Sequence, residues 1–164
     1  MNWDALGASA EAVGALAILV TLIYLAVQVR QAKLATADTN RLTRASGVRE
    51  VTLAMMQNPK LRESVWSAYG NAGAQYLQDL AEQTGGSVED AVQIDLYTQY
   101  YLWLHWGQFS TTMTPADERE LRNIAGAFYN VPAIRYAWEN GAGTKAIMDA
   151  DFAAFIDSVL AEPT

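Results

Sequence analysis

The N-terminal part of the chain is dominated by a run of apolar positions that no charge interrupts. Residues 12–29 read AVGALAILVTLIYLAVQV, eighteen positions without Asp, Glu, Lys or Arg. A helix rises about 1.5 Å per residue, so this run alone reaches roughly 27 Å, and a start at Leu6 extends it past the ~30 Å hydrocarbon layer of a bilayer. The pattern therefore predicts one transmembrane helix.

An apolar run of this length has two other possible explanations, a cleaved signal peptide and a buried helix of a soluble protein. A signal peptide carries positive charge before its apolar run, whereas here Asp4 and Glu11 come before the run and Arg30 and Lys33 follow it. This order is typical of a stop-transfer segment. The buried helix stays open, because eighteen residues lie at the short end of the spanning range.

The helical pattern continues beyond the apolar run as far as Asn58. Apolar residues are separated by polar ones with helical spacing, and no proline interrupts them before Pro59. Gly47 is the weak point, since glycine inside a helix costs about 1 kcal/mol relative to alanine, so a break there is an open alternative. Asn58 is then expected to cap a new helix with Pro59 as its first residue.

The rest of the chain also carries helix signals, and no segment alternates with the period of two that is typical of a strand. Residues 70–86 have glycines at both ends and are expected to be a linker with at most one short helix. Polar caps followed by acidic residues predict helix starts at Ser87, Thr114 and Asp149. The predicted helices cover 88–110, 115–129, 132–139 and a last segment after residue 149. The predicted fold class is all-α.

The predicted organisation has three parts, which also differ in charge. They are an N-terminal tail and transmembrane helix at 1–29, a basic juxtamembrane helix at 30–57 and an acidic cytoplasmic helical bundle at 58–164. Residues 30–62 hold seven basic against two acidic residues, and residues 63–164 hold four against fourteen. The basic block suits anionic lipid headgroups, and the acidic remainder argues against nucleic acid binding.

Basic residues predict the orientation of the span, because Lys and Arg are retained on the cytoplasmic side. None precedes the run, and five follow it within residues 30–49. We therefore expect a membrane protein with a short N-terminus outside and residues 30–164 in the cytoplasm. The residues expected at the membrane surface are Trp3, Arg30, Lys33, Arg41 and Arg44. The absence of cysteine suits a cytoplasmic domain.

One side of the predicted span carries small residues and then polar ones at alternating intervals of three and four. This seam is expected to contact a neighbouring helix, because small residues let backbones approach closely in lipid. Its members are Gly7, Ala10, Gly14, Ala17, Thr21, Tyr24 and Gln28. The alternative is compositional, since Gly and Ala are common in transmembrane helices. Glu11 has two interpretations, a headgroup contact or a functional ionisable site, of which we favour the headgroup contact.

Candidate chemistry is sparse. Residues 97–109 hold a dense group of aromatic side chains around His105, which could coordinate the metal of a haem or chlorophyll-type pigment. Aromatic residues at helical spacing are more simply explained as core, and we favour that interpretation. Gly85, Gly86 and Ser87 could hold an anion at a helix start, but neither a lysine nor a strand accompanies them. No catalytic motif is present, so we expect no enzyme activity, no cofactor and no metal site.

Four segments carry a resemblance to a known group of proteins. They are MNWDALGASAEAVGALAILVTLIYLAVQVRQ, NPKLRESVW, PADERELRNIAGAFYNVPAIRYAWENG and DADFAAFIDSVL. Together they resemble a widespread group of small uncharacterised bacterial proteins with one N-terminal span and a helical domain. The resemblance implies an inner-membrane location and no activity or catalytic residue. The middle helix is richer in Tyr and Trp than is usual in that group.

These observations favour a non-enzymatic accessory or scaffold subunit of a larger inner-membrane complex, such as a respiratory or light-harvesting assembly. Its expected partners are other transmembrane subunits and the anionic bilayer surface. Two alternatives stay open. One is a membrane-tethered sensor or ligand-binding module that uses the aromatic cluster, and the other is a homo-oligomer assembled through the seam.

Overall fold

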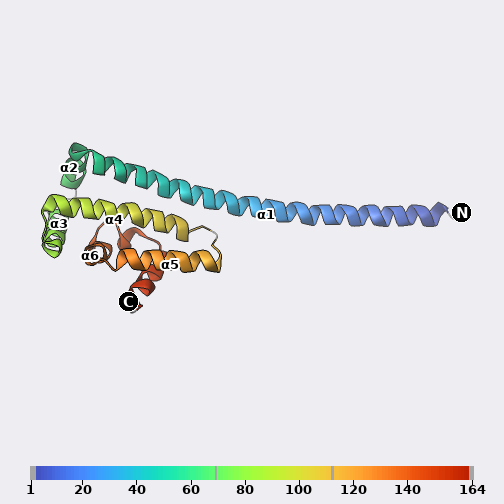
Figure 1. Cartoon of the computed structure of the whole chain (residues 1–164). Helices are drawn as coiled ribbons and strands as arrows, with labels where there is room; N and C mark the ends of the chain where they lie inside the picture. Colours follow the sequence, from blue (N-terminus) through green and yellow to red (C-terminus); the bar gives the residue numbers. More distant parts are fainter. Residues whose placement is uncertain (1–2, 69, 112, 163–164) are drawn as a thin grey trace. The chain divides into compact units, whose positions relative to one another are not determined.

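The computed structural model describes residues 3–68, 70–111 and 113–162, with the side chains of residues 3–6, 9 and 10 left aside (Figure 1). These residues form seven α-helices and one short 3₁₀ helix, and none of them lies in a strand. The all-α prediction is thereby confirmed. The helices are α1 Trp3–Gln57, α2 Pro59–Ala68, α3 Gly70–Thr84, α4 Val88–Phe109, α5 Pro115–Tyr129, α6 Pro132–Asn140 and α7 Ala150–Ala161, with η1 at Lys145–Ile147.

The chain divides into two compact units, residues 1–39 and residues 40–164, and the division falls inside α1. Unit 1 is the N-terminal part of α1. Unit 2 contains the rest of α1 and all the later helices. Helix α1 runs through Gly47 without a break, so the alternative of a break at that glycine is wrong. A Cβ atom at position 47 would meet no other side chain within 4 Å.

The predicted helix starts in unit 2 are confirmed by their caps. The Ser87 hydroxyl accepts a bond from the Asp90 amide while the Asp90 carboxylate accepts from the Ser87 amide, and Thr114 and Asp117 repeat this reciprocal box. The Asp149 carboxylate accepts from the Phe152 amide at 2.9 Å. Each cap satisfies amides that a helix N-terminus leaves without an intrahelical partner.

The expected linker at 70–86 is wrong, because residues 70–84 form the fifteen-residue helix α3. Its inward side chains Leu77, Leu80 and Ala81 are buried against α4 and α6. Gly70 and Gly85 bracket the helix with φ values of +62° and +65°, a conformation that glycine adopts at little cost. The glycines were correctly identified as boundaries, but tertiary packing stabilises a helix between them.

Two hydrophobic clusters form the core of unit 2. The first lies between α4, α5, α6 and α7 and is rich in aromatic rings, with Trp138, Tyr129 and Phe152 all fully buried. The second joins α3 to α4 through Leu80 and Leu96. The C-terminal part of α1 contributes Ala45, which approaches Gly107 of α4 so closely that a Cβ atom at position 107 would lie 3.1 Å from the Ala45 Cβ.

Candidate functional site

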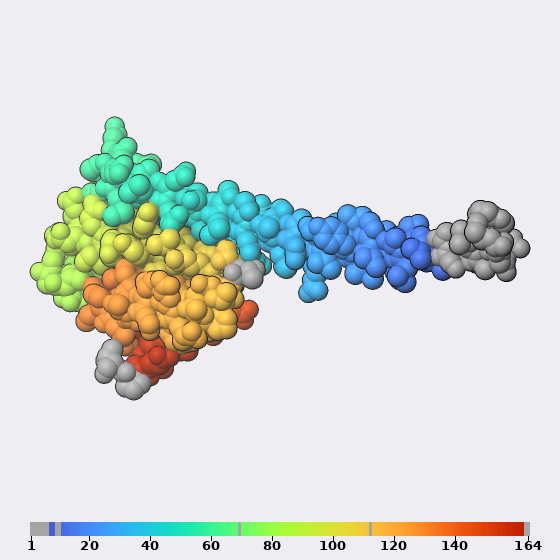
Figure 2. Space-filling view, turned by 45° about the vertical axis from the view of Figure 1, so that its right-hand side comes forward, coloured from blue at the N-terminus to red at the C-terminus, as the bar shows by residue number. Residues whose placement is uncertain are grey.

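The apolar surface of unit 1 is the most unusual surface of this protein. Its large apolar side chains are exposed to between about half and two-thirds of their full area, from 49% at Val27 to 68% at Val13. The aliphatic ones within residues 12–29 are Val13, Leu16, Ile18, Leu19, Val20, Leu22, Ile23, Leu25, Val27 and Val29. None of the eighteen residues in the most apolar window of α1 is buried. Figure 2 shows this stretch, drawn in blue, as a narrow rod.

The polar side chains within this apolar run bond inside their own helix. The Thr21 hydroxyl donates to the Ala17 carbonyl at 2.8 Å, and the Gln28 amide donates to the Tyr24 hydroxyl at 2.8 Å. Polar groups that are satisfied within the helix lower the cost of placing it in hydrocarbon. Length and composition therefore make α1 the one candidate span among the described residues.

The seam is open at its described positions. A Cβ atom at Gly7 or Gly14 would meet nothing within 4 Å, and Thr21 and Tyr24 have exposed side chains. The side chain of Ala10 lies outside the described residues. A neighbouring helix could approach along this line without a steric obstacle from unit 1 itself. The predicted helix contact stays a prediction.

The predicted membrane-surface residues have different environments in the two units. Arg30 and Lys33 are exposed in unit 1, and the Trp3 side chain lies outside the described residues. In unit 2, the Arg44 guanidinium stands 5.8 Å from the centre of the Trp106 ring, within the range of a cation–π contact. Arg41 is also in unit 2, where its side chain is exposed.

His105 lies in the aromatic core of unit 2. It is 1% exposed, and the rings of Tyr101, Phe128 and Tyr129 surround it with centroids 5.4–5.9 Å away. Its Nδ1 atom is 3.5 Å from the Tyr129 hydroxyl. Burial lowers the pKa of His105 to about 4, so the imidazole is neutral at neutral pH. A haem would have to displace packed rings to reach it, and this geometry suits a core residue better than a ligand.

A buried carboxylate on α4 is a polar feature that the sequence analysis missed. Asp95 is 1% exposed and accepts hydrogen bonds from the Tyr76 hydroxyl of α3 at 2.5 Å and from the Gln99 amide at 2.6 Å. Burial raises the pKa of Asp95 to about 6, although both hydrogen bonds act to lower it. The signal in the sequence was an acidic residue on the same helix face as Val92 and Leu96. This network joins two helices and has a structural role.

The candidate anion loop at Gly85, Gly86 and Ser87 already holds a carboxylate. The Asp90 carboxylate accepts from both the Ser87 amide at 2.9 Å and the Ser87 hydroxyl at 2.7 Å. These bonds lower the pKa of Asp90, which keeps the loop negatively charged. An incoming anion would therefore be repelled. Within the described parts of the chain, no three His, Asp or Glu side chains are grouped as metal ligands would be.

Comparisons with protein-family models, with curated proteins and with solved structures find no match to this chain. The geometry of the molecule is therefore the basis for its functional interpretation.

Proposed function

We propose that the protein is a non-enzymatic accessory subunit of a bacterial inner-membrane complex, anchored by one span in α1. The main support is that none of the residues in the eighteen-residue apolar window of α1 is buried. Soluble monomers rarely expose contiguous apolar patches larger than a few hundred Å². A helix that is apolar on every side requires an apolar environment on every side, and a bilayer supplies one.

The flanking charges support insertion in a definite direction. Asp4 and Glu11 precede the apolar window, while Arg30 and Lys33 follow it. The positive-inside rule then assigns unit 2 to the cytoplasm. In this arrangement Arg30 and Lys33 lie at the headgroups, where each basic residue contributes about 1 kcal/mol of attraction to anionic lipid.

A scaffolding role agrees with how the polar side chains of unit 2 are used. The bundle encloses both Asp95, whose pKa is raised by burial, and His105, whose pKa is lowered by burial. Asp149 caps α7 and also accepts from the Trp106 indole at 2.6 Å. These groups hold helices together. The ligand-binding alternative has less support, because the aromatic cluster that it requires is core.

Cysteine labelling tests insertion and orientation together, since the natural chain has no cysteine. We expect Asn2→Cys to react with a membrane-impermeant maleimide in intact spheroplasts. Ala127→Cys, on the exposed face of α5, is expected to react only after lysis. The chain is also expected to stay in the membrane pellet at alkaline pH. Labelling of position 127 in intact spheroplasts would overturn the orientation, and release by alkali would overturn the anchor.

Purification from membranes in a mild detergent, followed by mass measurement of the intact assembly, tests the accessory role. We expect other membrane subunits to remain associated. A Gly14→Leu substitution in the seam is expected to release them, because a bulky side chain separates closely packed helices. Val20→Leu, on another face of the span, serves as the matched control. A ring of this chain alone would instead support the homo-oligomer and refute the accessory role.

A further inference from the structure

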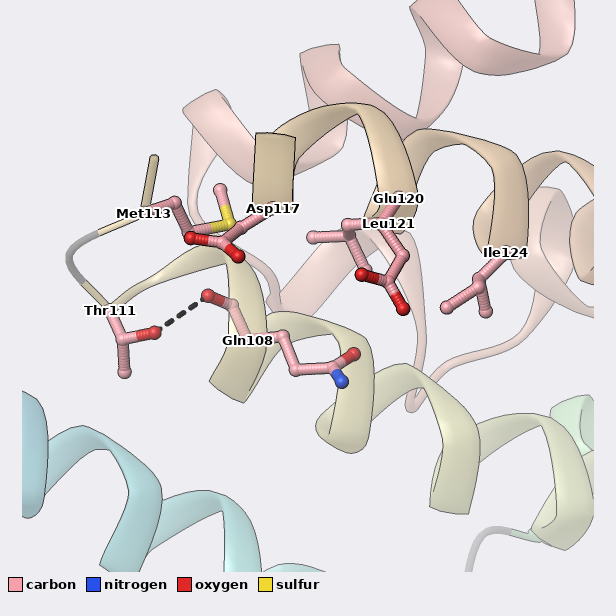
Figure 3. Close-up of a pocket in the computed structure, with 7 residues that line it drawn as sticks. All are labelled: Gln108, Thr111, Met113, Asp117, Glu120, Leu121 and Ile124. Carbon is pink, nitrogen blue, oxygen red and sulfur yellow. Dashed lines mark hydrogen bonds between the residues drawn. The ribbon is translucent and has the colours of Figure 1, made fainter. Parts of the chain in front are cut away.

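A pocket of about 260 Å³ lies between the C-terminal end of α4 and the first turns of α5 (Figure 3). It belongs entirely to unit 2. Its apolar side is formed by Met113, Leu121 and Ile124, of which Leu121 is buried and Ile124 is 43% exposed. Figure 3 shows Glu120 and Ile124 extending from α5 on the side of Gln108.

The pocket also carries two carboxylates, Asp117 and Glu120, three residues apart on α5 and therefore on neighbouring positions of one helix face. Bonds from the Thr114 amide and hydroxyl lower the pKa of Asp117, so it is ionised at neutral pH. Glu120 makes no ion pair with any residue that the structure describes.

The two basic residues of α5, Arg119 and Arg122, are both absent from the lining of the pocket. Arg122 binds Glu162 at 2.8 Å and lies over the Phe155 ring of α7 at 5.1 Å. It does not line the pocket. The lining of the pocket therefore holds two carboxylates, Asp117 and Glu120, beside its apolar side chains, and it holds no Lys or Arg. A hydrocarbon stem ending in a positive charge complements both parts, because such a stem covers apolar surface while its head reaches the carboxylates.

We propose that this pocket receives an arginine side chain from a cytoplasmic loop of an integral membrane partner. This inference rests on the proposed function, because the cytoplasmic loops of membrane proteins carry an excess of Lys and Arg. A partner in the same membrane therefore presents the required charge on the required side. The size of the pocket is below the range of about 300–1,000 Å³ that is usual for small-molecule sites, which suits one side chain. The guanidinium matches carboxylates better than an ammonium does, because its planar donors bind them in pairs.

Methyl NMR of the full chain in lipid nanodiscs tests the proposal. The probe is the blocked peptide acetyl-Gly-Arg-Gly-amide, and the matched probe replaces arginine with citrulline, which has nearly the same shape without the charge. We expect the arginine peptide to shift the Ile124 and Met113 methyl signals in a saturable way. The exposed Ile147 methyl lies outside the pocket and is expected to stay fixed.

Two variants that remove the same charge from α5 separate the pocket from the overall acidity of the domain. Glu120→Gln is expected to weaken arginine binding by up to about fivefold, the size of one exposed ion pair. Glu118→Gln lies outside the pocket and is expected to leave binding unchanged. Asp117 is left intact because it also caps α5. Raising the salt concentration from about 0.05 to 0.3 M is expected to weaken binding through screening.

Several outcomes would overturn the inference. These are equal shifts with the citrulline peptide, equal weakening by both variants, or no saturable shift at Ile124. Spermidine is the third probe, and tighter binding of spermidine than of the peptide would indicate a site for a free polyamine instead. Each of these results leaves the labelling test of the anchor unaffected. Conversely, a chain that binds the arginine peptide here but fails to insert would refute the proposed function and the membrane partner, and would leave the arginine site itself in place.

Discussion

The apolar run of α1 and the last helix α7 are both rich in large apolar side chains, yet their surroundings are opposite. In α7, Phe152, Ile156 and Val159 are buried, while Asp151 and Asp157 occupy the other face. In α1, residues 12–29 are apolar on every side and all exposed. An apolar stripe on one side of a helix is buried when the rest of the bundle packs against that side, whereas a helix that is apolar all round requires an apolar solvent. The distribution of the apolar residues around a helix therefore matters more than their number.

The largest expected effect breaks the apolar cylinder itself. The double substitution Leu19→Arg/Ile23→Arg places two charges near the middle of the run, which costs about 5–7 kcal/mol on insertion scales. We expect the chain to move from the membrane fraction to the soluble or aggregated fraction. Cell fractionation followed by immunoblotting measures this.

The matched double substitution is Val51→Arg/Val131→Arg, which adds the same charges at exposed positions of unit 2. It is expected to remain in the membrane fraction. Equal membrane retention of both double variants would show that the apolar run is not the anchor.

The second effect breaks the bundle and leaves the span intact. Trp138→Ala removes a fully buried ring that contacts Tyr129 and Phe152 edge-on, and large-to-small substitutions of this kind cost about 3–5 kcal/mol. We expect this loss in the free energy of unfolding of unit 2, measured by denaturant titration with circular dichroism. Tyr24→Ala, at a ring that is 61% exposed, is expected to leave that free energy unchanged. A stable Trp138→Ala bundle would contradict the aromatic core.

The third effect is the pH dependence of stability, and it involves two buried groups whose pKa values are shifted in opposite directions. The pKa of Asp95 is raised to about 6, so its contribution to stability is full below about pH 4 and is lost as the pH rises through 6. The pKa of His105 is lowered to about 4, so its contribution is full above about pH 6.5 and is lost as the pH falls through 4. Across this window the two contributions oppose each other in the natural chain.

Asp95→Asn separates these contributions, because asparagine keeps the shape of the side chain and removes its charge. The variant is expected to gain stability relative to the natural chain on going from pH 4 to pH 7, by at most about 3 kcal/mol. It should also lose stability on acidification below pH 6.5, as His105 alone requires. Denaturant titrations at pH 4, 5, 6 and 7 measure both trends. A constant difference between the two chains across these pH values would contradict the burial of Asp95.

The smallest effect compares two glycines of unit 2. Gly47→Ala adds a methyl group that meets nothing within 4 Å, so it is expected to stabilise α1 by about 1 kcal/mol. Gly107→Ala places its methyl group 3.1 Å from the Ala45 Cβ, and this crowding is expected to offset the gain. Thermal melting followed by circular dichroism measures the difference. Equal gains at both positions would show that α1 and α4 do not approach closely at Ala45.

The comparison of glycines also illustrates how far a sequence pattern reaches. A glycine inside a helical pattern was interpreted as a weak point at position 47, and the pair at 70 and 85 as the ends of a linker. At 47 the helix continues because the surrounding residues favour it. Between 70 and 85 the buried leucines of α3 stabilise a helix. Local propensity is small, at about 1 kcal/mol per glycine, and packing exceeds it.

The candidate functional residues likewise fall into those that the sequence indicated and those that only the tertiary structure shows. The aromatic cluster around His105 was visible in the sequence, but only the packing of α4 against α5 distinguishes a core imidazole from a ligand. The pairing of Asp95 with Tyr76 and the pocket beside Glu120 were not visible, because Tyr76 and Asp95 are nineteen residues apart and the pocket joins two helices across a loop. Long-range pairs of this kind leave no periodic signal.

The sequence by itself determined the all-helical class, the starts of α2, α4, α5, α6 and α7, and the apolar run in α1. These features depend on residues within one or two helical turns, where caps and periodicity act directly. Only the tertiary structure decided that α3 is a helix, that Asp95 and His105 are buried, and that an acidic pocket lies between α4 and α5. These depend on which faces meet, and the free energy of that packing comes from contacts between distant segments.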